Sequence, residues 1–105
     1  MICAEFFKKG GKLIGFSISG HSGAACSGRD IVCAAVSSAA YLTANTVTDV
    51  IGVKAGVSAG GGRMELTVPD SGADKCAVTL KGFRLHMEGL RKQYPEYLHV
   101  HDTEV

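Results

Sequence analysis

The sequence predicts an α+β fold, a two-layer β-β-α-β-β-α-β sandwich in which two helices cover one face of a mixed sheet. Two patterns predict it: apolar residues alternate in several short runs, and they recur at helical spacing in two longer ones. The chain has 105 residues, with 14 glycines against 2 prolines. That length fits one domain over residues 1–105, since no linker or internal repeat divides it.

The first half of the chain predicts a hairpin followed by a helix. Residues 2–8 and 13–19 are expected strands, and a glycine-containing loop is expected over residues 20–29. Asp30 is the expected N-cap of a helix that ends near Asp49. The residues expected to face the sheet are Ile31, Ala35, Ala39, Leu42 and Thr46.

The second half predicts another hairpin, a long helix and a last strand. Alternating apolar residues predict strands over 50–59 and 63–68, joined by three glycines. A helix is expected over 73–94, and Pro95 ends it before a strand over 97–101. The apolar stripe of that helix comprises Ala77, Leu80, Phe83, Met87, Leu90 and Tyr94, and its expected solvated residues are Lys81, Arg84, Arg91 and Lys92.

Composition excludes several classes of function. A net charge of +1 gives no field to attract nucleic acid or an anionic membrane. The longest uncharged stretch, residues 31–48, is expected to be too polar to span a membrane. No basic segment precedes an apolar one at the start, so we expect no secretory signal. We therefore expect a cytoplasmic protein with reduced thiols and with no direct nucleic-acid or membrane partner.

The candidate chemistry lies between residues 19 and 37. If Asp30 caps the helix, Cys33 falls in the first turn, where unpaired N–H groups and the helix dipole favour a thiolate. His21 stands twelve residues earlier and could take the thiol proton, then return it to a leaving group. Either residue alone is more often structural. Together they indicate nucleophilic catalysis by a Cys–His pair.

Other residues of this region are expected to support the pair. Gly20 would let a substrate backbone approach, and Asp30 is a structural cap rather than a catalytic acid. Ser37 lies one helical turn beyond Cys33 on the same face, where it either supports the site or fills the helix–sheet interface. The loop expected to be functional or mobile includes Ser22, Gly23, Cys26 and Gly28.

A zinc site is the alternative chemistry. His21, Cys26 and Cys33 could supply ligands, but the tight paired spacings of structural zinc sites are absent. His99 and His101 share one face of a strand, which more simply predicts the polar outer face of an edge strand. We therefore expect no metal. The glycine-rich loop also lacks the spacings that bind phosphates.

The motif resembles one known family. Gly20-His21 followed by Gly28-x-Asp30-Ile31-Val32-Cys33-Ala34-Ala35-Val36-Ser37 is similar to the ribosomal-processing cysteine proteases, the Prp family, as are the chain length and the element order. The resemblance implies a cytoplasmic endopeptidase, usually a homodimer. Such an enzyme removes the N-terminal extension of a large-subunit ribosomal protein during ribosome assembly, without metal or organic cofactor.

The resemblance also implies roles for individual residues. It matches Cys33 to the nucleophile and His21 to the general base, and it matches Gly20, Asp30 and Ser37 to other motif positions. The loop departs from the family, because it has no aromatic residue and carries a second thiol, Cys26. A Cys26–Cys33 disulfide would be an oxidative off-switch, although a simple loop filler is the preferred interpretation. The rival functions are a non-catalytic ribosome-associated binding module and a zinc-binding structural protein.

Overall fold

The computed structural model describes residues 1–20 and 27–105, and side chains for 1–20 and 31–105. Its strands are β1 (Ile2–Lys9), β2 (Lys12–Ser19), β3 (Gly56–Gly60), β4 (Arg63–Thr67) and β5 (Leu98–Glu104). Its helices are α1 (Ser27–Asn45), the π-helical η1 (Thr46–Ile51), the short 3₁₀ segment η2 (Asp70–Gly72) and α2 (Ala73–Gln93).

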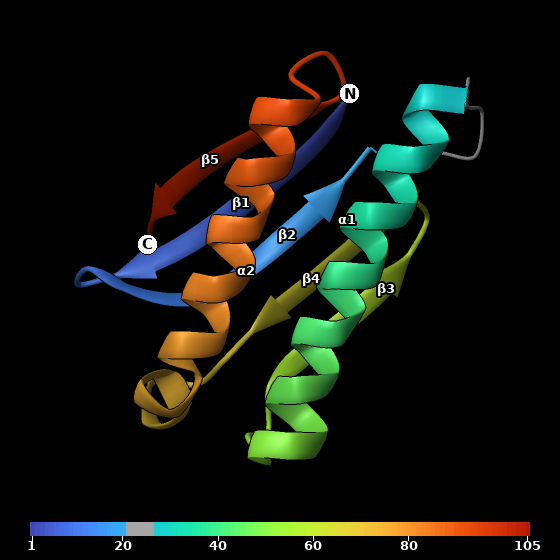
Figure 1. Ribbon diagram of the computed structural model, residues 1–105. Coiled ribbons are helices and arrows are strands. Elements are labelled where there is room, and N and C mark those ends of the chain that lie inside the picture. The colour runs from blue at the N-terminus through green and yellow to red at the C-terminus, as the bar shows by residue number, and fades with distance from the viewer. Residues whose placement is uncertain (21–26) are drawn as a thin grey trace.

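The strands form one mixed sheet in the order β3-β4-β2-β1-β5. β5 pairs parallel to β1, and the other neighbours pair antiparallel. Both long helices lie on the same face of this sheet (Figure 1). The predicted two-layer α+β architecture and its element order are therefore confirmed.

The core lies between the sheet and the two helices. Phe6 of β1, Phe16 of β2 and Phe83 of α2 are 0%, 0% and 4% exposed. The Phe83 ring centroid lies 5.5 Å from that of Phe6 and 4.6 Å from that of Phe16. Tilted and edge-on aromatic pairs at these separations add to the burial energy. The three rings therefore fix α2 over the central strands.

The residues of α1 that face the sheet differ from the prediction. Val32 and Val36 of α1 and Val47 of the following η1 are fully buried, whereas Ile31 and Leu42 are 58% and 69% exposed. The predicted stripe is therefore wrong by one helical position. Because α1 is rich in alanine and apolar on two sides, periodicity alone allows two stripes. The sheet contacts the one that carries the valines.

The expectation that residues 31–48 are too polar to span a membrane is also wrong, as judged by length and composition. Residues 31–51 are long and apolar enough by that criterion, with a mean hydropathy of 1.3. A third of the tested window is buried inside the protein. The valines of α1 are part of the core, whereas other apolar residues of the stretch, among them Ile31 and Leu42, are exposed.

The predicted strand over 50–59 is present only in part. The chain stays helical through η1 and leaves it at Gly52, which adopts φ +83° and donates its N–H to the Val47 carbonyl oxygen at 3.1 Å. Val53 then packs against Gly72, where an added Cβ would lie only 2.6 Å from a Val53 methyl. The strand begins only at Gly56, and all five residues of β3 are exposed.

The last strand is longer than predicted, and one expected surface residue is bound. β5 extends to Glu104, and the Val105 N–H donates to the Lys8 carbonyl oxygen. Arg84 of α2 donates two hydrogen bonds to Asp102 of β5, at 2.7 and 2.9 Å. The prediction that Arg84 only faces solvent is therefore wrong. This pair joins α2 to the β5 edge of the sheet.

Candidate active site

Cys33 lies further along α1 than predicted. The helix begins at Ser27, so Asp30 is its fourth residue and Cys33 its seventh. The prediction that Asp30 is the N-cap is wrong, because the Ser and Gly before it already have helical backbone. The electrostatic effect of a helix end falls off within one turn. The prediction that Cys33 lies in the first turn of the helix is therefore also wrong.

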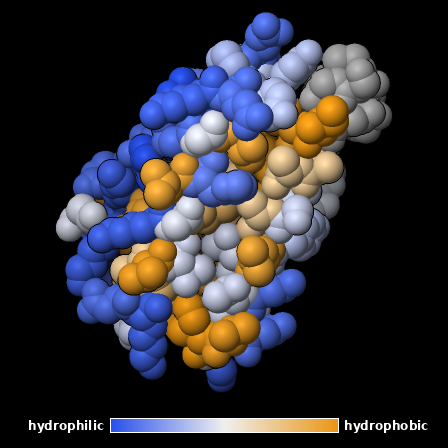
Figure 2. Space-filling view, viewed as in Figure 1, coloured by the Kyte–Doolittle hydropathy of each residue, from blue (hydrophilic) through white to orange (hydrophobic). Residues whose placement is uncertain are grey.

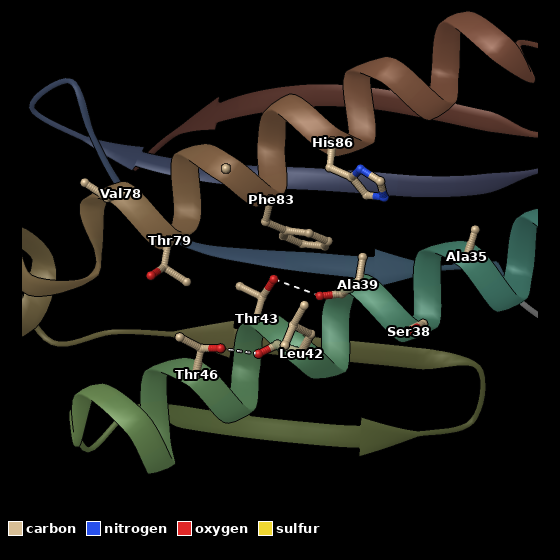
Figure 3. Close-up of a pocket in the computed structure, with 11 residues that line it drawn as sticks. Ala35, Ser38, Ala39, Leu42, Thr43, Thr46, Val78, Thr79, Phe83 and His86 are labelled. Carbon is tan, nitrogen blue, oxygen red and sulfur yellow. Dashed lines mark hydrogen bonds between the residues drawn. The ribbon is translucent and has the colours of Figure 1, made fainter.

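The helical phase shows which way Cys33 points. With 100° per residue, Cys33 and Ser37 lie on one side of the buried valine stripe, and Ala35 and Leu42 lie on the other. Ala35 and Leu42 line a groove that α2 also lines, so Cys33 faces away from α2. Both views place α1 over the β4–β3 half of the sheet (Figures 1 and 3). Cys33, which is half-buried and packed against the core, therefore lies on the side of β3.

Several predicted site residues lie outside the described residues. These are His21, Ser22, Gly23 and Cys26, so the geometry of the Cys33–His21 pair is not part of the structure. Gly28 is described and belongs to α1. The predicted loop over 20–29 is therefore too long at its C-terminal end, because residues 27–29 are helical.

Gly20 has a structural reason to be glycine. Its φ is +87°, a conformation that other residues adopt at a cost. An added Cβ would collide with the carbonyl oxygen of Met1. The residue follows the end of β2 and packs against the backbone at the start of β1. Its predicted role in admitting a substrate backbone stays a prediction.

The described part of the chain contains an open groove of about 600 Å³ between α1 and α2. Figure 3 shows Phe83 at its floor and His86, Leu42 and Val78 along its sides. The hydroxyl of Thr43, which also lines it, donates to the Ala39 carbonyl oxygen at 2.8 Å. The groove is consequently mostly apolar. It lies on the opposite side of α1 from Cys33, so it is separate from the thiol site.

The sequence indicated one wall of this groove, but not the groove itself. Its α1 wall is formed by most of the residues that were expected to face the sheet, among them Ala35, Ala39, Leu42 and Thr46. The spacing indicated a continuous helical face correctly. The signal did not say whether the sheet or a groove lay opposite that face.

The other thiols and imidazoles do not form a second site among the described residues. No group of three His, Cys, Asp or Glu side chains that could hold a metal occurs there. His99 and His101 lie side by side on the outer edge strand, with ring centroids 5.3 Å apart, as predicted. Cys76 is fully buried, and burial raises the pKa of its thiol, so it is a poor nucleophile.

The sequence also matches a family model. Residues 1–99 match the model described as "Cysteine protease Prp". The chain belongs to this family. It is therefore a cysteine protease, and the family match covers every predicted site residue. No curated protein matches the chain.

Solved structures share the fold over the whole chain. SMU.848 from Streptococcus mutans is 25% identical with a TM-score of 0.88, over 100% of this chain and 96% of that one. The ribosomal processing protease Prp from S. aureus, in complex with a substrate peptide, is 18% identical with a TM-score of 0.89. That match covers 98% of this chain and 100% of the S. aureus chain.

Proposed function

We propose that this protease removes the N-terminal extension of a large-subunit ribosomal protein during ribosome assembly, with Cys33 as nucleophile and His21 as general base. The match to the Prp family over residues 1–99 supports it most directly. The fold shared with the S. aureus ribosomal processing protease supports the class of substrate. We place the reaction in the cytoplasm, where ribosomes are assembled, and propose that it needs no cofactor.

The placement of the described thiols supports Cys33 as the nucleophile. Cys76 is completely buried beneath α2. Cys3 lies on β1 between the inward-facing Ile2 and Ala4, so it points to the sheet face opposite the helices. Cys33 is partly exposed on α1 and lies within the family motif. Of these three thiols, it alone combines access with the motif.

The proposed reaction proceeds through a thioester. His21 accepts the proton from the Cys33 sulfur, and the thiolate attacks the scissile carbonyl carbon. The protonated His21 then gives its proton to the departing amine, which leaves the acyl group on Cys33. His21 next takes a proton from water, and the hydroxide attacks the thioester carbon. The C–S bond breaks, the new carboxyl terminus leaves, and the proton on His21 returns to the Cys33 sulfur. Because the N-terminus of α1 is a full turn away, proton removal by the histidine is the main source of activation.

Ser37, Gly20 and Asp30 complete the proposed site as positioning residues. Ser37 lies one turn beyond Cys33 on the same side of α1 and is half-buried. Gly20 precedes His21 in the chain and packs closely against Met1. Asp30 lies one turn before Cys33 in the same helix. None of the three is proposed to exchange protons with the substrate.

The test is cleavage of a synthetic peptide that spans the extension and the cleavage junction of the host's large-subunit ribosomal protein. We expect Cys33→Ala and His21→Ala each to lower kcat by more than about 10³-fold, while circular dichroism shows an intact fold. Cys3→Ser is the matched control, because it removes a thiol from the opposite sheet face and is expected to cleave normally. Full activity in Cys33→Ala would falsify the proposal.

We also propose that the working form is a homodimer. The helix layer exposes large apolar side chains, among them Leu42 (69%), Val78 (83%) and Leu85 (74%). Figure 2 shows several separate apolar patches on the face that carries the helices. Exposed apolar patches of this kind mark protein contacts. Sedimentation equilibrium is expected to give twice the chain mass of 10.9 kDa, and Val78→Glu is expected to give the mass of one chain. If the wild type shows the mass of one chain at a protein concentration of about 100 μM, the dimer proposal is contradicted.

A further inference from the structure

β3 is an open edge of the sheet. It is the terminal strand in the order β3-β4-β2-β1-β5, and within the described residues it pairs only with β4. All five of its residues, Gly56-Val57-Ser58-Ala59-Gly60, are exposed and small or medium in size. Natural proteins usually protect such an edge with lysine, proline or a covering segment. β3 contains neither residue, so its main chain is approachable.

The hairpin register shows which main-chain groups point outward. β3 and β4 close at the Gly60–Arg63 pair around Gly61 and Gly62, whose φ values are +62° and +77°. In a two-residue hairpin the closing pair is hydrogen-bonded, and the bonding alternates along the strands. Val57 and Ala59, opposite Leu66 and Met64, therefore direct their N–H and C=O groups away from β4. They offer two donors and two acceptors to one added strand.

The same two residues lie on the side of the sheet that bears Cys33. Leu66 and Met64 are buried beneath the helices, so Val57 and Ala59 share the helix-covered face. Yet Val57 is 46% exposed, because α1 does not cover the edge. The Gly60 end of β3 lies toward the same end of the molecule as the first half of α1 (Figures 1 and 3). A chain laid along β3 thus passes the side of α1 on which Cys33 lies.

The other sheet edge offers no such arrangement. β5 stands at the opposite end of the strand order and carries Asp102 and Glu104. Asp102 is bound by Arg84 of α2, the helix from which Cys33 faces away. An extended peptide on β5 would therefore lie on the far side of the molecule from the thiol.

We propose that β3 binds the substrate as an added β-strand, through the outward main-chain groups of Val57 and Ala59. The inference rests on the proposed function, because the occupant is the extended peptide that Cys33 cleaves. Recognition by main-chain hydrogen bonds suits an unfolded extension, and alternate peptide side chains would meet the small residues of β3. The edge supplies affinity and alignment, and Cys33 supplies the chemistry.

The first test is an N-methyl scan of the junction peptide, which carries a fluorescein label. The peptide is bound to the Cys33→Ala variant, which is not expected to cleave it. A methyl on an amide that donates to β3 removes one hydrogen bond, whereas a methyl on the next amide does not face β3. We expect Kd from fluorescence anisotropy to rise about three- to tenfold at every second position. A profile without this alternation, or no binding of the unmethylated peptide, overturns the proposal.

The second test removes a donor from the protein. Val57→Pro and Ala59→Pro each delete an outward N–H and leave the β4 ladder intact, and each is expected to raise Kd for the labelled peptide about three- to tenfold. Glu104→Pro is the matched control, because the β1–β5 register directs its N–H outward on the other edge. It is expected to change Kd by less than twofold. Thermal melts verify that each variant is folded.

The outcomes separate this inference from the proposed function. If the wild type cleaves the peptide but the proline variants bind it normally, the edge assignment fails and the protease assignment stands. If the alternating profile appears but Cys33→Ala retains full cleavage in the unlabelled assay, the nucleophile assignment fails and the edge assignment stands. If Val57→Pro instead converts a dimer into single chains, the occupant of β3 is a second copy, and the proposal is overturned.

Discussion

The two ends of the sheet are held in different ways. At the β5 end, Asp102 receives hydrogen bonds from Arg84 and an ion pair from Lys8 at 3.2 Å. The Arg84 guanidinium also lies 5.9 Å from the centroid of the Phe6 ring. At the β3 end, the described residues show no ion pair or side-chain hydrogen bond between α1 and the sheet. The described side chains of α1 therefore meet the sheet through apolar contacts.

This difference separates stability from access. The β5 end combines aromatic packing with the ion pairs of Asp102 to Arg84 and Lys8. We therefore expect α2 and the central strands to be the most stable part of the domain. The β3 end leaves a thiol and a strand edge partly exposed, which a protease needs if an extended chain is to enter. A domain of 105 residues has only a small hydrophobic core. Its strongest contacts lie at the end away from Cys33.

The largest expected effect on stability is at Phe83. Phe83→Ala removes the ring that contacts both Phe6 and Phe16, and it is expected to lower the free energy of unfolding by about 3–5 kcal/mol. Val57→Ala truncates an apolar side chain at the open edge and is expected to cost less than about 1 kcal/mol. Urea titration of both variants measures the two values. Equal losses would show that the β3 end carries as much stability as the aromatic centre.

The fold was predictable because its strands and helices differ in period. Alternation in β1 and β2 and the stripe of α2, with Leu80, Phe83 and Met87 buried, are strong signals that agree with their packing. α1 is different. Its alanines leave Ile31 and Val32 equally plausible as inward residues, and only the position of the sheet decides between them. The alternation from Val53 to Ala59 likewise did not indicate a strand over its whole length. Gly52 ends η1, and Val53 packs against Gly72 before the strand begins.

The family was predictable from the motif, but the surroundings of Cys33 were not. The Gly20-His21 pair and the run around Cys33 identify the family, which the match over residues 1–99 confirms. The depth of Cys33 within α1 was not predictable, because Ser27 and Gly28 have low helix propensity and were assigned to a loop. The open edge at β3 was hidden for a related reason. Its Val57 and Ala59 were predicted to face inward, and they lie on the helix-covered face of the sheet, but all of β3 is exposed.

A smaller effect on stability is expected at the Arg84–Asp102 pair of the β5 end, and it depends on pH. Hydrogen bonds from Arg84, and to a lesser degree from Lys8, hold the pKa of Asp102 below its usual value. A lowered carboxyl pKa in the folded state stabilises the protein above the unfolded pKa of about 3.9, and the effect is lost as the pH falls through the folded value. Asp102→Asn is therefore expected to cost about 1 kcal/mol at pH 7 and almost nothing near pH 2.

The control for this prediction is an ion pair that is fully open to water. Lys9 pairs with Asp70 at 3.0 Å, with side chains 56% and 75% exposed. Water and salt screen such a pair, so Lys9→Ala is expected to change stability by less than about 0.5 kcal/mol. Thermal melts of both variants between pH 2 and pH 7 provide the comparison. If the two variants lose the same amount at pH 7, Arg84 and Asp102 add nothing beyond a surface pair. In that case the aromatic rings alone make the β5 end the firmer one.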